Sequence, residues 1–513
     1  MIVVYHKNNK VVHIECQGNN ISFENTSISK ILFQLAEKHQ EKWIIWCHVN
    51  EKENLNFDRF DIIFYHQKIM TSYNVLQNTF LPEAIGYVEE TPFIKINKEV
   101  KYPTWQMSSI AGGIHASVLF ALKDEVFPDN NFDYFLNSFA KLAMPKGLFC
   151  YSDPELLKKN SQTEQKIKKN DYTLFRFVKQ HYKSSWVFLL FLDLFLYEKK
   201  VLVLPMLFSL FFSKRELKND SLVKIQAQSV KKVIHTKTID VLIPTIGRKQ
   251  FLYDTLKDLS KQTLIPENVI IVEQNPEIAS VSELNYIQNE YWPFKIKHIF
   301  THQPGACNAR NLALAEVKSE WIFMADDDIR LDADFLERSF SFIEKQGAEQ
   351  VTFGCYAPDY AEKSKIKEIL QWSGFGSGCS IVKSVNVKSI IYNTGFEFGY
   401  GEDSDFGMQL RNSGFDILFS PVPEIIHLKA PMGGFRTKPV LAWHKDIIQP
   451  KPSPTIMLYK MLNLSKEQVN GYKTVLFFKY YKFQGIKNPI NYYKNFRKQW
   501  GKSVFWANQL NKK

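Results

Sequence analysis

Three consecutive aspartates, Asp326 to Asp328, follow the apolar run 321–325. In an extended strand alternate side chains face opposite sides, so we expect Asp326 and Asp328 to project together and Asp327 to point away. Two carboxylates in one small volume repel each other unless a cation joins them, and oxygen ligands suit Mg²⁺ or Mn²⁺ that also binds a substrate diphosphate. An acidic turn before a helix is the alternative interpretation. A calcium loop is disfavoured, because Leu331 stands where that loop requires Gly.

A second acidic pair, Glu402 and Asp403, follows the glycine-rich run GFEFGYG and precedes a helix predicted over 404–412. When an acceptor hydroxyl attacks a substrate directly, a carboxylate must take its proton while a metal on the opposite side assists departure of the leaving group. Asp403 is the candidate for this general base, with Glu402 beside it as a second catalytic candidate. Capping of the helix by acidic residues is the alternative.

The elements that must position these carboxylates begin at Ile239. Apolar strands such as IDVLIP, NVIIVEQ and KIKHIF alternate with helices predicted over 249–262 and from Ala306. Strands that are apolar on both faces and alternate with helices predict a parallel sheet covered by helices, an α/β fold. In such a sheet ligands bind at the carboxyl ends of the strands, where Pro244 and Thr245 end the first strand and Glu273 ends the second.

Five segments occur in an order that resembles a known family: VLIPTIGR, VIIVEQN, PGACNARNLAL, FMADDDI and YGEDSDFGMQLRNSGF. They are similar to the inverting family 2 glycosyltransferases of GT-A fold, a Rossmann-like architecture with a mostly parallel sheet. The resemblance covers about residues 239–436. It implies a nucleotide-sugar donor, with a UDP-sugar favoured, a saccharide or lipid-linked acceptor, and Mn²⁺ or Mg²⁺ as cofactor.

The family pattern also implies roles for individual residues. Asp403 would be the base, and Asp326, Asp328 and His427 would be metal ligands, although a histidine after an apolar run is often simply packed. The end of the second strand departs from the pattern, because Glu273 is followed by Gln274 where many relatives carry a second acid, and this leaves the nucleotide base open. The residues implied in binding the nucleotide-sugar are Pro244, Thr245, Glu273, Arg310, Asn311, Asp326 and Asp327.

Composition shifts divide the chain into three expected parts. Residues 1–235 alternate strand-like and helical runs and form an α/β domain, for which a degenerate GT-A-like copy without the paired aspartates is one hypothesis. Residues 236–438 form the GT-A domain. Residues 439–513 form a basic, aromatic helical region that suits a membrane interface or, alternatively, packs against the catalytic domain with a solvated basic face.

One further apolar stretch, residues 185–212, is divided by charged residues into two runs, each too short to span a membrane. We expect a buried helix followed by a buried strand, with a membrane-dipping hairpin as the alternative. The start of the chain lacks the features of a secretory signal, and the six cysteines lack zinc spacing. A cytoplasmic protein with free thiols, at most at the inner face of the plasma membrane, is expected.

The formal net charge of +12 allows attraction to nucleic acid, phospholipid or a diphosphate substrate and does not choose among them. A basic nucleic-acid-binding protein is one alternative, but no recognised nucleic-acid motif appears, so no nucleic-acid partner is expected. A scaffold that binds nucleotide-sugar without turnover is another. By analogy with the family, the leading hypothesis is an enzyme of bacterial cell-surface polysaccharide or glycolipid synthesis.

Overall fold

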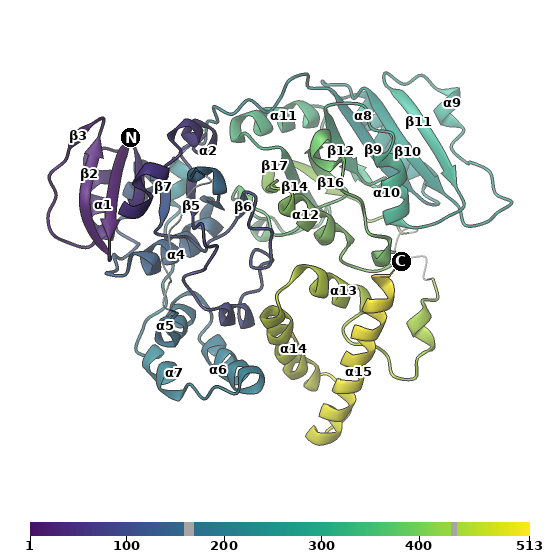
Figure 1. Ribbon diagram of the computed structural model, residues 1–513. Helices are drawn as coiled ribbons and strands as arrows, with labels where there is room; N and C mark the ends of the chain where they lie inside the picture. The colour runs from purple at the N-terminus through teal and green to yellow at the C-terminus, as the bar shows by residue number, and fades with distance from the viewer. Residues whose placement is uncertain (159–168, 432–438, 513) are drawn as a thin grey trace. The chain divides into compact units, whose positions relative to one another are not determined.

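The computed structural model describes residues 1–158, 169–431 and 439–512 (Figure 1). The chain divides into two compact units. The first contains Met1–Lys231 and Ser465–Phe478, and the second contains Lys232–Leu464 and Lys479–Lys513. The C-terminal part, expected from the sequence as a region of its own, is therefore shared between the two units.

The second unit is built on one mixed sheet. Strands β11, β10, β9 and β12 pair in parallel, β16 lies antiparallel between β12 and β14, and β14 pairs in parallel with β17. The short strands β13 and β15 both pair antiparallel with β17. In spatial order the main strands are β11 (Lys295–Thr301), β10 (Asn268–Gln274), β9 (Ile239–Thr245), β12 (Trp321–Ala325), β16 (Cys379–Lys383), β14 (Gln350–Tyr356), β17 (Leu418–His427) and β13 (Ile329–Arg330), with β15 at Leu370–Gln371.

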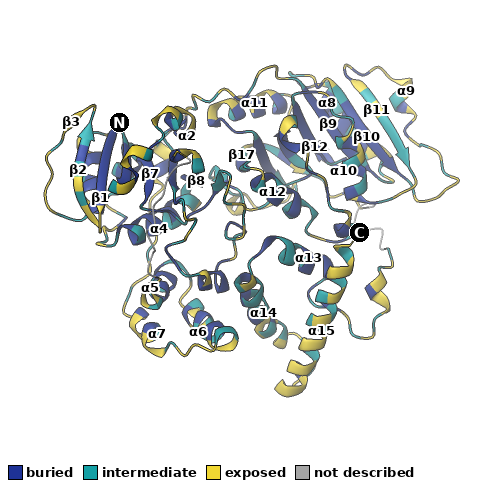
Figure 2. Ribbon diagram, viewed as in Figure 1, coloured by how far each residue is buried: buried dark blue, intermediate teal, exposed yellow. Residues whose placement is uncertain are grey.

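Helices bury the apolar side chains of this sheet. Leu242 of β9 and Ile322 of β12 lie in one core with Phe406 of α12, and the C-terminal helices contribute Met457 and Ala507 to it. Figure 2 colours most of the central strands of this sheet as buried. The α/β class and the helical C-terminal region expected from the sequence are confirmed. The helices of this unit are α8 (Lys249–Ser260), α9 (Tyr286–Asn289), α10 (Ala306–Leu314), α11 (Phe335–Gln346), α12 (Glu402–Asn412), α13 (Pro454–Asn463) and α15 (Pro489–Leu510).

The first unit is a second α/β unit with its own sheet. Its strands, in spatial order, are β3 (Asn19–Asn20), β2 (Lys10–Cys16), β1 (Ile2–Lys7), β4 (Trp43–His48), β7 (Ala111–His115), β5 (Ile69–Tyr73), β8 (Phe149–Ser152) and β6 (Tyr102–Pro103). Its helices are α1 (Ile28–Lys38), α2 (Phe60–Ile63), α3 (Ala116–Leu122), α4 (Phe132–Ala143), α5 (Asp171–His181), α6 (Ser185–Glu198), α7 (Val203–Ser209) and the first part of α14 (Lys466–Tyr481).

The two sheets share the connectivity of their central strands. Along the chain the second unit has β9, β12, β14, β16 and β17, arranged in space as β9-β12-β16-β14-β17. The first unit has β1, β4, β5, β7 and β8, arranged as β1-β4-β7-β5-β8 with the same sequence of parallel and antiparallel pairings. The units differ beyond this core, where β9 has the parallel neighbour β10 and β1 has the antiparallel neighbour β2.

The apolar stretch 185–212 differs from its prediction. Its first run is the expected helix, α6, but its second run forms helix α7 instead of a strand. Several of its large apolar side chains are exposed, among them Leu204 and Phe211, so the expectation of a buried pair of elements was wrong. Within the described residues, no helix is long and apolar enough to cross a membrane. All six cysteines are free thiols.

Candidate active site

A cavity of about 360 Å³ opens at the carboxyl ends of β9 and β12. This is the edge of the sheet at which the sequence predicts ligand binding, because the strand ends and the following loops converge there. Most of the residues singled out from the sequence line it. They are Pro244, Thr245, Arg310, Asp326, Asp327, Asp328, Glu402, Asp403 and His427.

Three of these residues form a possible metal site. Oxygen atoms of Asp326 and Asp328 and a ring nitrogen of His427 all lie within 4.8 Å of one another. Asp328 Oδ2 accepts a hydrogen bond from the backbone N–H of Ala430 at 2.8 Å. Its Oδ1 is buried and lies 3.2 Å from His427 Nε2. Two carboxylates and a histidine are a donor set that fits Mn²⁺ or Mg²⁺.

The electrostatic environment keeps Asp328 ionised. Burial would raise the pKa of its carboxyl group, but His427, the Ala430 N–H and the Arg248 guanidinium outweigh burial and lower it. In return, the contact with Asp328 raises the pKa of His427. Asp328 is therefore available as an anionic ligand throughout the neutral range.

Asp327 points away from the possible metal group and supports the wall of the cavity. Its carboxylate accepts hydrogen bonds from Thr245 Oγ1 at 2.7 Å and from Arg248 Nη1 at 2.6 Å. Burial raises the pKa of Asp327 to about 6, although both partners oppose the shift. The side chains of Asp327 and Thr245 are thus engaged with each other. The role of Arg248 was not foreseen, since the only signal in the sequence is a basic residue after VLIPTIG.

Helix α12 begins at Glu402, two residues earlier than predicted, so both acids lie in its first turn. Asp403 Oδ1 accepts a hydrogen bond from Ser377 Oγ, and Tyr392 donates its hydroxyl to the same Ser377 oxygen at 2.6 Å. Burial raises the pKa of Asp403, opposed by Arg310. Burial and the neighbouring Asp403 together raise the pKa of Glu402 to about 7. These shifts are those expected of carboxyl groups that exchange protons near neutral pH.

Arg310 provides positive charge among these acids. Its Nη2 atom lies 3.2 Å from Asp326 Oδ1, and its guanidinium carbon lies 5.6 Å from the centre of the Tyr392 ring. A guanidinium held in this way can face an anionic ligand in the cavity, because it presents several fixed N–H donors. The structure therefore places Arg310 beside the Asp326 carboxylate and inside the cavity.

Sequence reasoning missed Glu397, which lines the cavity and holds the start of α10. Its Oε1 accepts the backbone N–H of Asn308 at 2.6 Å, and its Oε2 accepts that of Cys307 at 3.3 Å. Gly305 precedes the helix with φ +145°, and a Cβ there would lie 2.4 Å from Glu397 Oε1. The N-terminus of α10 is therefore occupied by a carboxylate of the chain itself.

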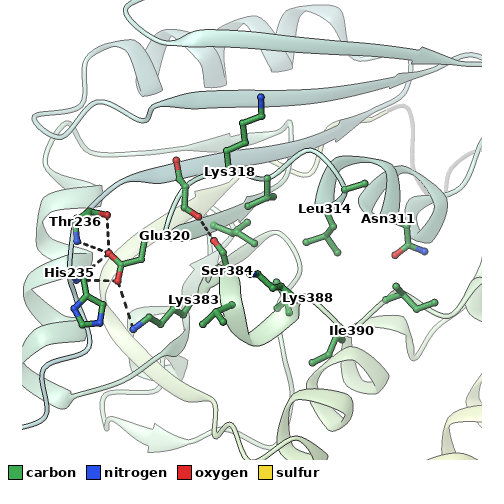
Figure 3. Close-up of a pocket in the computed structure, with 17 residues that line it drawn as sticks. His235, Thr236, Asn311, Leu314, Lys318, Glu320, Lys383, Ser384, Lys388 and Ile390 are labelled. Carbon is green, nitrogen blue, oxygen red and sulfur yellow. Dashed lines mark hydrogen bonds and ion pairs between the residues drawn. The ribbon is translucent and has the colours of Figure 1, made fainter.

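Two predicted nucleotide-binding residues do not line the cavity. Glu273 is buried, with Oε2 2.8 Å from His298 Nε2. Asn311 forms two hydrogen bonds of 2.8 Å with the backbone of Tyr392. Asn311 instead lines a separate cavity of about 900 Å³, which Lys318 and Lys383 also line (Figure 3). These two residues hold neighbouring chain segments in place, and the cavity wall at the end of β10 is formed by Gln274.

Residues 240–394 match the family described as Glycosyl transferase family 2. This segment contains β9 to β16 and the aspartates 326–328. The expected resemblance and the enzyme class, a glycosyltransferase, are confirmed by this match. Glu402, Asp403 and His427 follow the matched segment along the chain. No curated protein matches the chain.

Solved structures are similar only in part. The crystal structure of S. aureus TarS is 15% identical, covers 46% of this chain and 42% of that chain, and gives a TM-score of 0.33. TarS 1–349 in complex with UDP-GlcNAc is 16% identical over 46% of this chain and 70% of that one, with a TM-score of 0.34. GalNAc-T7 with UDP, GalNAc and Mn²⁺ is 12% identical, with 44% and 48% covered and a TM-score of 0.34. The chain thus spans less than half of full TarS.

Proposed function

We propose that the second unit is a metal-dependent inverting glycosyltransferase that moves a sugar from a nucleotide-diphosphate-sugar to an acceptor hydroxyl. One observation carries the proposal: the Asp326, Asp328 and His427 donors lie within 4.8 Å of one another in the same cavity as Asp403. Metal ligands and a base facing one cavity are what a single displacement at a phosphate-activated sugar requires. A UDP-sugar is the favoured donor.

Asp326, Asp328 and His427 would hold Mn²⁺ or Mg²⁺, which when bound supplies positive charge to the departing nucleoside diphosphate. Asp403 takes the proton of the acceptor hydroxyl as the acceptor oxygen bonds to the anomeric carbon and the bond from that carbon to the diphosphate breaks. Because one displacement occurs, the configuration at that carbon inverts. Ser377 fixes the orientation of the Asp403 carboxylate, and Arg310 places positive charge beside the diphosphate.

The acceptor and the location extend this proposal. We infer a saccharide or lipid-linked acceptor and a role in bacterial cell-surface polysaccharide or glycolipid synthesis at the cytoplasmic face of the membrane. The basic C-terminal region supports membrane contact through some of its aromatic side chains. Phe483, in the turn after α14, is 82% exposed and Tyr493 of α15 is half exposed, whereas Tyr492 and Phe496 of α15 are buried.

We further propose that the first unit is a degenerate copy of the GT-A unit. The shared order of five strands supports this, and the registers agree in detail. Ala111, the first residue of β7, pairs with Cys47 near the end of β4, and Cys379, the first residue of β16, pairs with Ala325 at the end of β12. By this correspondence His48 takes the position of Asp326.

The counterpart of the proposed base is also present in the first unit. Asp133 is the second residue of α4, and Asp403 is the second residue of α12. Asp133 Oδ1 accepts the backbone N–H of Ser109 at 2.9 Å, and Ser109 precedes β7 by two residues, as Ser377 precedes β16. By the same correspondence Asn50 takes the position of Asp328. Since His48 and Asn50 replace Asp326 and Asp328, the first unit lacks both carboxylates of the candidate metal site. The proposal therefore predicts that each chain binds one Mn²⁺ ion, and binding of two Mn²⁺ ions per chain would contradict it.

The main test incubates the purified protein with a panel of nucleotide-sugars plus Mn²⁺ or Mg²⁺ and measures nucleoside diphosphate release. Asp328→Ala and Asp403→Asn should each abolish metal-dependent turnover. Asp332→Ala is the matched control, because this side chain is 74% exposed and pairs only with Arg338. If the protein binds nucleotide-sugars but turns none over with any of many acceptors, the hypothesis of a scaffold replaces that of an enzyme. If it binds oligonucleotides with a steep salt dependence and turns over no donor, the hypothesis of a nucleic-acid-binding protein is favoured.

A further inference from the structure

Exposed apolar side chains of helices α6 and α7 form a surface on the first unit, and Figure 2 colours stretches of both helices as exposed. We call it the α6–α7 surface, and two of its side chains are mostly in water: Phe211 is 88% exposed and Leu204 is 69% exposed. Contiguous exposed apolar side chains on this scale mark interaction sites, because water contact with them is unfavourable. Its defining residues are Phe188, Phe195, Val201, Leu204, Leu207 and Phe211.

The chain around α7 contains no charge. From Val201 to Ser213 there is no Asp, Glu, Lys or Arg, yet only Pro205 and Ser209 are buried in that stretch. Residues 159–168, which lie outside the described part of the chain, contain Ile167 as their single large apolar residue. That segment has too few apolar side chains to cover the surface.

The surface is firmly attached to the first unit. Val187, Leu190 and Leu194 on the other face of α6 are buried in the core of the unit. Thr474 of α14 donates a hydrogen bond to Asp193 Oδ1 at 2.5 Å, which ties α6 to a second helix. The exposed side chains are thus presented by a packed helix and are not the result of a loosely held segment.

Positive charge surrounds this apolar surface. Between Asp171 and Glu216 the chain has seven Lys or Arg and four acids, and one of the acids, Asp193, is buried. Exposed lysines stand at both ends of the helices, at Lys183, Lys199 and Lys214, the last of which pairs with Glu216 at 2.9 Å. A second copy of the chain would bring the same positive charges together, whereas anionic lipid headgroups complement them.

We propose that the α6–α7 surface binds the face of an anionic lipid bilayer, with its Phe and Leu side chains in the acyl boundary and the lysines at the headgroups. Helix α6 has 14 residues, which is about 21 Å, so it lies in the interface and does not span it. This proposal is independent of the catalytic one, since all its residues belong to the first unit.

The test measures binding of the full chain to large vesicles by co-sedimentation. Vesicles with one third phosphatidylglycerol should bind the protein, and pure phosphatidylcholine should bind it at least about tenfold more weakly. The triple variant Val201→Ser, Leu204→Ser and Phe211→Ser should lose at least about tenfold in affinity for the anionic vesicles. Because these side chains are exposed, folding is expected to be preserved, and an unchanged circular dichroism spectrum and thermal unfolding midpoint would verify this.

The matched control replaces three apolar residues of the second unit that are at least as exposed, Ile278, Val281 and Tyr291, by Ser. Vesicle binding should be unchanged in this variant. Equal binding by the wild type and the Val201, Leu204 and Phe211 variant would overturn the proposal. The proposal would also be overturned if the wild type does not bind vesicles and instead forms a dimer that the triple variant cannot form.

Discussion

The backbone of Gly378 lies directly against the carboxylate of Asp326. A Cβ built on Gly378 would lie 2.1 Å from Asp326 Oδ2 and 2.3 Å from its Cγ. No side chain can occupy that space unless the carboxylate moves, so Gly378 fixes where this possible metal ligand stands. This gives a use to one glycine of the run SGFGSGCS, residues 373–380.

Gly378→Ala should therefore reduce kcat/KM for donor turnover by about tenfold to a hundredfold, because a ligand displaced by an ångström loses much of its effect. Steady-state nucleoside diphosphate release would measure this. Gly501→Ala in α15 is the control, since a Cβ there meets nothing within 4 Å. Equal activity of the two variants would show that Asp326 has no role requiring its present position.

Replacing Glu402 by Gln should move the acidic limb of the pH–rate profile. The wild-type pair has raised pKa values, with that of Glu402 at about 7. A base with a raised pKa is protonated and inactive at low pH, so activity should rise with pH as Asp403 ionises. Removing the neighbouring negative charge lowers the pKa of Asp403, and the limb should shift to lower pH by about one unit. A profile of kcat/KM from pH 5 to 9 would measure it, and a shift to higher pH would contradict the argument.

His427→Ala should raise the Mn²⁺ concentration needed for half-maximal activity by about tenfold or more, because one of three donors is lost. A titration of activity with Mn²⁺ would measure the change. His302→Ala serves as control, since this histidine is exposed and bonds the backbone of Asn275. If the variant needs the same Mn²⁺ concentration as the wild type, His427 is not a metal ligand and is only packed against its neighbours.

Asp193→Asn should remove a pH dependence of stability. Burial raises the pKa of Asp193 to about 7 in the folded chain. In the unfolded chain it ionises near about 3.9. Between these values the folded state retains a proton that the unfolded state releases, so stability falls as pH rises and levels off above the folded pKa. Between pH 5 and pH 8 the free energy of unfolding of the wild type should fall by on the order of 1–3 kcal/mol more than that of the variant. Denaturant unfolding at both pH values would measure it, and parallel losses would contradict the assignment.

Periodic segments of the catalytic unit were predictable from the sequence. Strands β9, β10 and β12 and helices α8 and α10 lie where alternating apolar and helical patterns place them, because both faces of each strand are buried. The prediction failed for α7, whose residues are apolar but face water. A short apolar run does not by itself distinguish a buried strand from an exposed helix, and what covers it is decided by the rest of the chain.

The sequence by itself determined the local chemistry: three aspartates at a strand end, an acidic pair at a helix start, and an order of segments typical of one family. Tertiary structure decided which of these meet. It turned Asp327 toward Thr245 and Arg248, brought His427 from a strand a hundred positions away to Asp328, and removed Glu273 and Asn311 from the cavity. Strand pattern fixes which way neighbouring side chains alternate, but contacts between distant segments depend on sheet order and loop paths, which local pattern does not encode.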